Sequence, residues 1–226
     1  MTKYIPTIED LKSINIFSSL NDKELNLIKK FSSKISYTKN TIICLSGDPA
    51  TFFAGIIKGK IKVSSFSESG KEIAFYYLYP KDCFGEMSIF DKKSYRSATL
   101  TTVSKSEIII IKNVDFIRLI NEIPSLFIKL GEILADRLRH SNKKVESMCF
   151  FTLKQKVTDF LIECCEKSNN YVCSQKEIVE FTGANRESIS RVISEMRNNG
   201  IILKSEKNNL LKINLEKLKS YNEKNK

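Results

Sequence analysis

The sequence predicts an α+β protein in which an antiparallel β-domain is followed by a long helix and then by a small domain of helices and a hairpin. Three observations predict this order. Short β-branched and aromatic runs separated by turns occupy about 34–112, an apolar repeat of helical period runs over 124–149, and two short helices with a glycine turn precede a C-terminal hairpin. The 226 residues suffice for two small domains.

The first predicted element is helical and spans residues 8–31. Its apolar residues recur at helical spacing, and Asn21 or Asp22 is a plausible N-cap within it. Nowhere does an apolar run approach the roughly 18 residues of a membrane-spanning helix, and the N-terminus lacks the apolar stretch of a signal peptide. We therefore expect a cytoplasmic protein with no membrane partner.

Between about 34 and 112, strand-like runs alternate with turn signals. Turn residues such as Ser46-Gly47-Asp48-Pro49 and Ser67-Glu68-Ser69-Gly70 separate runs that are rich in Ile, Val, Phe and Tyr. The predicted strands are 41–45, 52–58, 61–63, 72–79, 83–84, 98–103 and 107–111. Strands at this spacing with short turns predict an antiparallel barrel or jelly roll.

A long helix is predicted after Pro124, a residue that the first turn of a helix tolerates. Its apolar positions recur with a period near 3.5: Phe127, Leu130, Leu134, Leu138, Val145 and Met148. A helix of about 25 residues is roughly 36 Å long, and such a stripe is exposed unless it meets a partner. We therefore predict a homodimer formed through this helix. Packing of the helix against the chain's own β-domain alone is the alternative.

Residues 150–226 predict a small helical domain with a hairpin. Phe150 to Glu166 is expected to form one helix, and Ser174 with Glu177 forms a capping box for a second helix that ends at Phe181. After a turn at Gly183, Asn185 caps a third helix, which ends at Asn199-Gly200. Residues 201–203 and 210–213 predict a hairpin, and the tail after 218 is expected to fray. This order is typical of a winged helix-turn-helix.

The third helix of this domain has one apolar and one polar face. The apolar face carries Ile189, Val192, Ile193 and Met196, and the polar face carries Glu187, Ser190, Arg191 and Ser194, with Arg186 at the first turn. Arginine can bond guanine N7 and O6 together, and glutamate can accept from cytosine N4, so the polar face suits major-groove reading. A solvated face with a Glu187–Arg191 pair is the alternative. The preceding capped helix and the following hairpin favour the DNA-binding interpretation over the solvated face.

Composition narrows the function further. The 37 basic and 26 acidic residues give a net charge of +11, which fits a polyanionic partner. The charge is spread along the chain, so it does not by itself locate a DNA-binding end. With one histidine and no C-x-x-C pair among six cysteines, we expect no metal site. No nucleophile, base and orienting group occur together, so we expect no enzyme and no catalytic residue.

Two motifs then resemble a known family. The run Gly183-x-x-Arg186-Glu187-Ser188-Ile189-Ser190-Arg191-Val192 resembles the recognition segment of the Crp/Fnr family of bacterial transcription regulators. Upstream, Phe84-Gly85-Glu86-Met87-Ser88-Ile89-Phe90 and Arg96-Ser97-Ala98-Thr99 resemble that family's cyclic-nucleotide phosphate-binding cassette. The resemblance covers roughly 14–215. It implies a cyclic-nucleotide-binding-like β-roll over 1–123, a dimerisation helix over 124–149 and a DNA-binding winged helix-turn-helix over 150–226.

The resemblance also implies an effector site. The implied effector is cyclic AMP or another cyclic nucleotide. Gly85 and Glu86 would hold its ribose, and Arg96 and Ser97 would hold its phosphate. A short helix after Gly85 offers free amides, and Arg96 offers a planar fork. On the long helix, the residues implied are Arg137 near the phosphate and Ser141 and Asn142 near the base. The alternatives are a Glu86–Arg96 pair as architecture, another small anion, a redox or haem sensor, or no ligand.

The DNA-binding residues follow in the same way. The expected contacts are Arg186, Glu187, Ser190 and Arg191 in the groove, together with Ser174 and with Lys207 on the wing. The resemblance implies a two-fold operator with a TGTGA-like half-site. The sequence therefore predicts a homodimeric, effector-gated transcription regulator, which we expect to contact RNA polymerase. A cyclic-nucleotide-binding module that controls a partner protein is the alternative.

Overall fold

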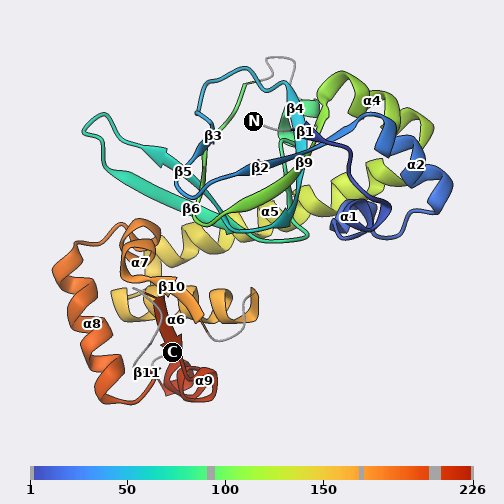
Figure 1. The fold of residues 1–226 in the computed structure, drawn as a ribbon. Coiled ribbons are helices and arrows are strands. Elements are labelled where there is room, and N and C mark those ends of the chain that lie inside the picture. Colours follow the sequence, from blue (N-terminus) through green and yellow to red (C-terminus); the bar gives the residue numbers. More distant parts are fainter. Residues whose placement is uncertain (1–2, 91–94, 168–170, 204–209, 225–226) are drawn as a thin grey trace. The chain divides into compact units, whose positions relative to one another are not determined.

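The computed structural model describes residues 3–90, 95–167, 171–203 and 210–224. The chain divides into two compact units (Figure 1). The first consists of Met1–Ser65 and Phe75–His140, and the second of Phe66–Ala74 and Ser141–Lys226. Lys207, an expected wing contact, lies outside the described residues.

Three short helical segments occupy the region 8–31, which was predicted to be helical. They are α1 (Ile8–Lys12), a 3₁₀ turn η1 (Asn15–Phe17) and α2 (Asp22–Lys30). Thr7 and Asn21 each form a capping box, in which the side chain accepts from the backbone amide three residues on. Two N-caps so close together start two separate helices within the predicted helical region. Asn21 is confirmed as an N-cap.

The strands of the first unit form two sheets, as the predicted jelly roll requires. One sheet has the order β1-β2-β9-β4-β7, with bounds Lys3–Tyr4, Ser32–Tyr37, Ser106–Lys112, Phe52–Lys58 and Cys83–Phe84. The other has the order β3-β8-β5-β6, with bounds Ile42–Cys44, Thr99–Thr102, Ile61–Phe66 and Glu72–Leu78. The pairs β2–β9, β4–β9 and β5–β8 are antiparallel. The predicted fold class is confirmed.

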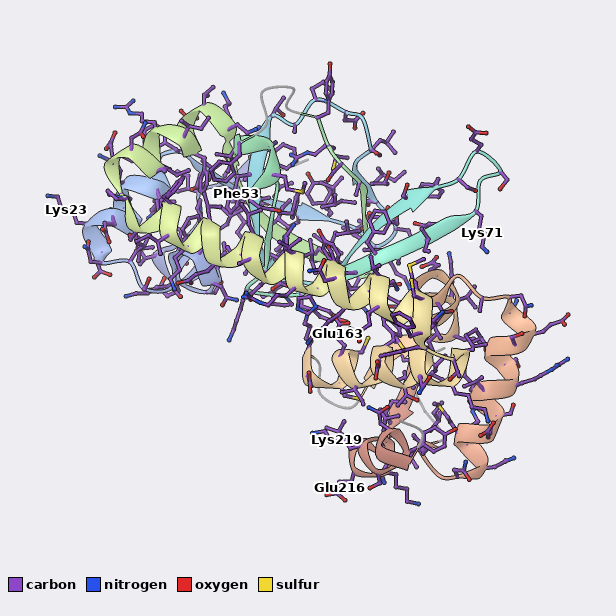
Figure 2. All side chains as sticks on the ribbon, turned by 180° about the vertical axis from the view of Figure 1, so that it is seen from behind. Lys23, Phe53, Lys71, Glu163, Glu216 and Lys219 are labelled. Atoms are coloured by element: carbon purple, nitrogen blue, oxygen red, sulfur yellow. The ribbon has the colours of Figure 1, made fainter. Side chains whose placement is uncertain are left out.

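Two buried clusters hold this unit together. One lies within the roll and includes Ile56, Val63 and Ile108. The other packs the N-terminal helices, α4 (Asn113–Glu122) and the start of α5 (Ser125–Phe150) against the first sheet. At its centre the rings of Phe53 and Phe116 stack with centroids 4.1 Å apart (Figure 2 labels Phe53). This second cluster fixes the N-terminal part of α5 on the roll.

Helix α5 has two apolar faces. Leu126 and Leu130 are fully buried in the first unit, so the prediction that Leu130 lies on a partner-facing stripe was wrong. Phe127, Leu138, Val145 and Met148 are between 57% and 63% exposed. These four residues follow a period of 3.5 and remain more than half exposed, although the Phe127 ring meets the Phe90 ring edge-on with centroids 5.9 Å apart.

The second unit contains the predicted helices and hairpin. Its elements are α6 (Leu153–Lys167), β10 (Tyr171–Ser174), α7 (Gln175–Thr182), α8 (Arg186–Asn198), β11 (Ile202–Leu203), β12 (Leu210–Ile213) and α9 (Leu215–Lys224). The strands form one sheet in the order β10-β12-β11. The tail after 218 was predicted to fray, and this was wrong, because the tail belongs to helix α9. Leu218 is fully buried, and Asn214 accepts a hydrogen bond from the Lys217 amide at 3.1 Å. Within the described ranges, no helix is long and apolar enough to cross a membrane.

Candidate functional site

A tight turn between β7 and the short helix α3 (Met87–Phe90) carries the first residues of the candidate effector site, which we call the effector pocket. Gly85 in this turn has φ of +90°, a conformation that L side chains rarely adopt. A Cβ at this position would lie 2.7 Å from both Arg96 Nη1 and the Phe52 carbonyl oxygen. Glycine therefore leaves room for the Arg96 guanidinium beside the turn.

Glu86 is fully buried and pairs with Arg137 of α5. Its Oε1 accepts a hydrogen bond from Arg137 Nη1 at 2.6 Å. The same guanidinium donates to Tyr76 Oη at 3.0 Å and to the Cys83 carbonyl oxygen at 2.5 Å. Burial alone would lower the pKa of Arg137, but Glu86 and Tyr76 raise it above its ordinary value, so the guanidinium stays charged. The structure thus brings Arg137, which the resemblance implied to lie near the phosphate, into contact with Glu86.

Arg96 has other partners than Glu86, so the alternative of an architectural Glu86–Arg96 salt bridge was wrong. Its Nη2 donates to the Phe52 carbonyl oxygen at 2.7 Å, and its guanidinium lies 4.3 Å from the centroid of the Phe52 ring. The side chain is 6% exposed, and burial lowers its pKa. Glu86 and Asp48 attract this guanidinium from a distance, but among the described residues no carboxylate forms a hydrogen bond with it, so it is suited to an anionic ligand.

Two buried polar atoms at this site have no hydrogen-bond partner among the described residues. They are Arg96 Nε, a donor, and Glu86 Oε2, an acceptor. An unsatisfied buried group of this kind costs about 1–3 kcal/mol, and more when it is charged. A ligand with an anionic group and a hydroxyl would satisfy both atoms.

The remaining expected effector residues are placed less closely. Ser97 is exposed, with Oγ 3.8 Å from the Met87 sulfur. Ser141 and Asn142 are exposed on α5 and belong to the second unit, so they are not placed against the pocket. Tyr76 was missed by the sequence analysis. A lone tyrosine in a predicted strand carries no signal that would single it out.

The helix-turn-helix is fixed by local hydrogen bonds. Ser174 caps α7, and Glu177 Oε2 accepts from the Ser174 amide at 2.9 Å. Gly183 ends α7 in the left-handed region with φ of +71°. Asn185 then caps α8, with Oδ1 accepting from the Ser188 amide at 2.8 Å. Both predicted caps and the glycine turn are confirmed.

Helix α8 has the two faces predicted for it. Ile189, Val192, Ile193 and Met196 are buried. The exposed side chains are Arg186, Glu187, Ser190, Arg191 and Ser194. Two guanidinium groups, a carboxylate and hydroxyls thus stand together on one exposed helix face, which is the chemistry of base-edge reading.

No second chemical centre is evident in the described ranges. They hold no group of three His, Cys, Asp or Glu side chains that could bind a metal ion. The six cysteines, all within the described ranges, form no disulfide with one another, and His140 is exposed on α5.

Comparisons with known proteins agree with this geometry. Residues 34–122 match the cyclic nucleotide-binding domain family, and residues 155–221 match the Crp-like helix-turn-helix domain family. The cAMP-activated global transcriptional regulator Vfr of Pseudomonas aeruginosa is 26% identical over 191 residues, which cover 80% of this chain and 89% of Vfr. The cyclic AMP receptor protein of Thermus thermophilus is 24% identical over 85% of this chain and 89% of its own length.

Solved structures share the fold. FixK2 from Bradyrhizobium japonicum superposes with a TM-score of 0.74 at 18% identity, covering 84% of this chain and 96% of FixK2. The c-di-GMP-responsive global regulator CLP from Xanthomonas campestris superposes with a TM-score of 0.73 at 18% identity, covering 85% and 99%. With both domain families matched in this order, the chain belongs to the Crp/Fnr family of effector-gated, DNA-binding transcription regulators.

Proposed function

We propose that this regulator binds a cyclic nucleotide in its β-roll and that the bound nucleotide controls its binding, as a homodimer, to a two-fold DNA operator. The observation that carries the effector proposal is the pair of unsatisfied buried atoms, Arg96 Nε and Glu86 Oε2. One is a cationic donor and the other an anionic acceptor. A cyclic nucleotide offers both counterparts, a phosphate and a ribose hydroxyl.

Each pocket residue has a distinct task in this proposal. Arg96 donates to the cyclic phosphate, with Ser97 and the α3 turn beside it, and Gly85 leaves the backbone open to the ligand. Glu86 accepts from the ribose hydroxyl through Oε2, because Arg137 already occupies Oε1. Arg137 therefore acts mainly by holding the Glu86 carboxylate, and Ser141 and Asn142 would meet the base.

Cyclic AMP is the first candidate effector. Vfr is named as cAMP-activated, as are further relatives that match this chain. CLP is named as c-di-GMP-responsive, so cyclic di-GMP is the second candidate. Both carry a phosphodiester for Arg96, and they differ greatly in size, so binding measurements distinguish them.

The exposed stripe of α5 supports the homodimer. Phe127, Leu138, Val145 and Met148 are apolar, more than half exposed and spaced as a coiled-coil seam. A second copy of α5 is the occupant that matches both the length and the period of this stripe. Dimerisation would also give the two recognition helices that a two-fold operator requires.

The exposed face of α8 supports the DNA-binding proposal. Arg186, Glu187, Ser190 and Arg191 would read base edges of a TGTGA-like half-site, while Ser174 and Lys207 would contact the backbone. We divide the chain into a sensor over 1–123, a dimerisation helix over 124–149 and a DNA-binding domain over 150–226. We further propose that the protein is a cytoplasmic regulator without catalytic activity and that it contacts RNA polymerase.

The test is to select duplexes from random DNA with the purified protein, with and without cyclic AMP, cyclic GMP or cyclic di-GMP. Calorimetry with each nucleotide runs in parallel. We expect one nucleotide to bind and to enrich a palindromic site. Enrichment without any nucleotide binding would refute the effector proposal alone, whereas nucleotide binding without any selected duplex would favour a module that acts on a protein partner.

A further inference from the structure

Two lysines that are far apart in the sequence donate to carbonyl groups at the C-terminal end of α7. Lys144 Nζ, on α5, donates to the Phe181 carbonyl oxygen at 2.7 Å. Lys71 Nζ, in the loop that precedes β6, donates to the Gly183 carbonyl oxygen at 2.8 Å. Both lysines lie in the second unit, and Figure 2 labels Lys71 on its hairpin. The two ammonium groups thus meet the turn that joins α7 to α8.

The last carbonyls of a helix lack partners within the helix, and positive charge is favourable there. Gly183 uses its amide to bond the Val179 carbonyl oxygen at 2.9 Å, which closes the last turn of α7. Helix α8 begins only three residues later, at Arg186. Whatever holds residues 181–183 therefore also sets where the recognition helix starts.

Lys144 is held more tightly than a surface lysine. Its Nζ lies 3.1 Å from the centroid of the Phe181 ring, and that ring stacks on Phe160 of α6 with centroids 4.3 Å apart. Two charged groups of α6 act on it: Glu163 attracts the ammonium, and Lys156 repels it. Burial lowers the pKa of Lys144 to about 8, so the ammonium persists at neutral pH despite desolvation.

Lys71 contacts the same turn from a segment that precedes α5 in the sequence. Its neighbour on the hairpin, Ile73, faces Gly183, since Ile73 Cδ1 would lie 3.7 Å from a Cβ built on that glycine. The turn is therefore contacted by an apolar side chain and an ammonium group from one hairpin, and by a second ammonium group from α5.

We propose that Lys144 and Lys71 are positioning residues for DNA binding, which hold the α7–α8 turn through their ammonium groups and so orient the recognition helix without touching DNA. Both are basic residues of a DNA-binding protein, and composition alone would assign them to the phosphate backbone. Their hydrogen bonds to Phe181 and Gly183 give them a different task.

The two lysines also belong to elements that reach the candidate effector pocket. Lys144 follows Arg137 by seven residues on α5, about two helical turns. Lys71 precedes Tyr76 by five residues on the hairpin that contains β6. Arg137 and Tyr76 contact each other, and Arg137 holds Glu86. This connection rests on the proposed effector function: a ligand that bonds Glu86 acts on the two elements that also carry the positioning lysines.

The test compares Lys144→Met and Lys71→Met with Lys143→Met, a matched control at an exposed position of the same helix. The probe is a duplex that the wild-type protein selects from random DNA. We expect each positioning variant to bind it about tenfold more weakly, as for a lost charge-assisted hydrogen bond. We expect the control to bind like the wild type, and Lys71→Arg to recover most of the loss.

Two readouts separate positioning from other roles. Because neither lysine neutralises a phosphate, the slope of log affinity against log salt should not change, whereas a lost phosphate contact lowers it by about one. Because Lys144→Met removes a desolvated charge, its melting temperature at pH 7 should stay the same or rise. A lower slope, or a fall in melting temperature that parallels the fall in affinity, would overturn the proposal.

A measurement without DNA completes the test. Hydrogen exchange of the amides of residues 181–189 should quicken in Lys144→Met and in Lys71→Met, but not in the control. Unchanged exchange together with unchanged affinity would refute the positioning role. A result in which cyclic nucleotides leave this exchange unchanged in the wild type, while both variants lose affinity for DNA, would support the positioning role and refute its connection to the effector pocket.

Discussion

Replacing Arg96 by leucine is the sharpest test of the effector pocket. Leucine keeps an apolar stem in a site where Arg96 lies 4.3 Å from the Phe52 ring, and it removes every donor of the guanidinium. Glu86 and Arg137 remain paired through their own 2.6 Å bond, which does not involve Arg96. The substitution therefore removes the proposed phosphate partner while leaving the rest of the pocket in place.

The magnitude follows from the partners that Arg96 has. Its Nη2 is bound to the Phe52 carbonyl oxygen, while Nε has no partner and is free for a ligand. One charge-assisted hydrogen bond is worth roughly 1.5–3 kcal/mol, so nucleotide affinity should fall about 10- to 150-fold. Freeing the Phe52 carbonyl adds a stability loss of roughly 1–3 kcal/mol, which should not abolish folding.

The assay is calorimetric titration of the wild type, Arg96→Leu, Arg96→Lys and Ser97→Ala with the nucleotide that binds the wild type. Arg96→Lys keeps the charge without the planar fork and should bind with intermediate affinity. Ser97→Ala removes one exposed neutral hydroxyl and should change affinity least. Unchanged affinity in a folded Arg96→Leu protein would refute the reasoning, because it would place the phosphate away from Arg96.

Three further predictions concern the other parts of the molecule. Arg191→Ala and Glu187→Ala should each cost about 1–3 kcal/mol in operator affinity and relax selection at one base pair per half-site, measured by selection from random DNA; a uniform loss across sequences would contradict base reading. Leu138→Asp combined with Val145→Asp should give a folded monomer in sedimentation, and a dimer would refute the α5 interface. The pKa of Lys144 is lowered to about 8 in the folded chain, so the unfolded chain binds more protons between that pH and the ordinary value of 10.5. The free energy of unfolding should therefore rise with pH across this window in the wild type more than in Lys144→Met, and equal pH profiles from denaturant titrations would contradict the burial of the ammonium.

Turn residues made most strands of the β-domain predictable, whereas two elements rich in polar residues were missed. Strands β3 to β9 lie where glycine, proline, serine and aspartate separate β-branched runs. Strand β2 was not predicted because Ser32-Ser33-Lys34-Ile35-Ser36-Tyr37 is mostly polar, although Ser32, Ile35 and Tyr37 are buried. Helix α9 was predicted to be a frayed tail because it is mostly polar and charged, and the one leucine that is fully buried, Leu218, gives no helical apolar pattern.

The sequence could not separate the two apolar faces of α5. Leu126 and Leu130 lie one residue before and three residues after Phe127, so both faces satisfy a helical period. Only tertiary packing decides that the first two are buried and that Phe127 is exposed. The candidate site shows the same limit. The cassette motif located Gly85, Glu86 and Arg96. The resemblance implied that Arg137 lies near the phosphate, but its contact with Glu86, 51 positions away in the sequence, is set by tertiary structure.

The geometry of Arg137 bears on how ligand binding could be linked to DNA binding. Its guanidinium joins three elements: Tyr76 on β6, the Cys83 carbonyl group on β7 and Glu86 beside α3. Glu86 accepts from Arg137 through one oxygen and would accept from the ligand through the other. The two hydrogen bonds share one carboxylate charge, so the Glu86–Arg137 bond should weaken when the ligand is bound. Helix α5 carries Lys144 as well as Arg137, and the hairpin of β6 carries Lys71 as well as Tyr76, so the Glu86–Arg137 bond lies on the same two elements as the lysines that donate to the α7–α8 turn. Substitutions at Arg137 should therefore alter the dependence of DNA binding on the nucleotide more strongly than they alter DNA binding itself.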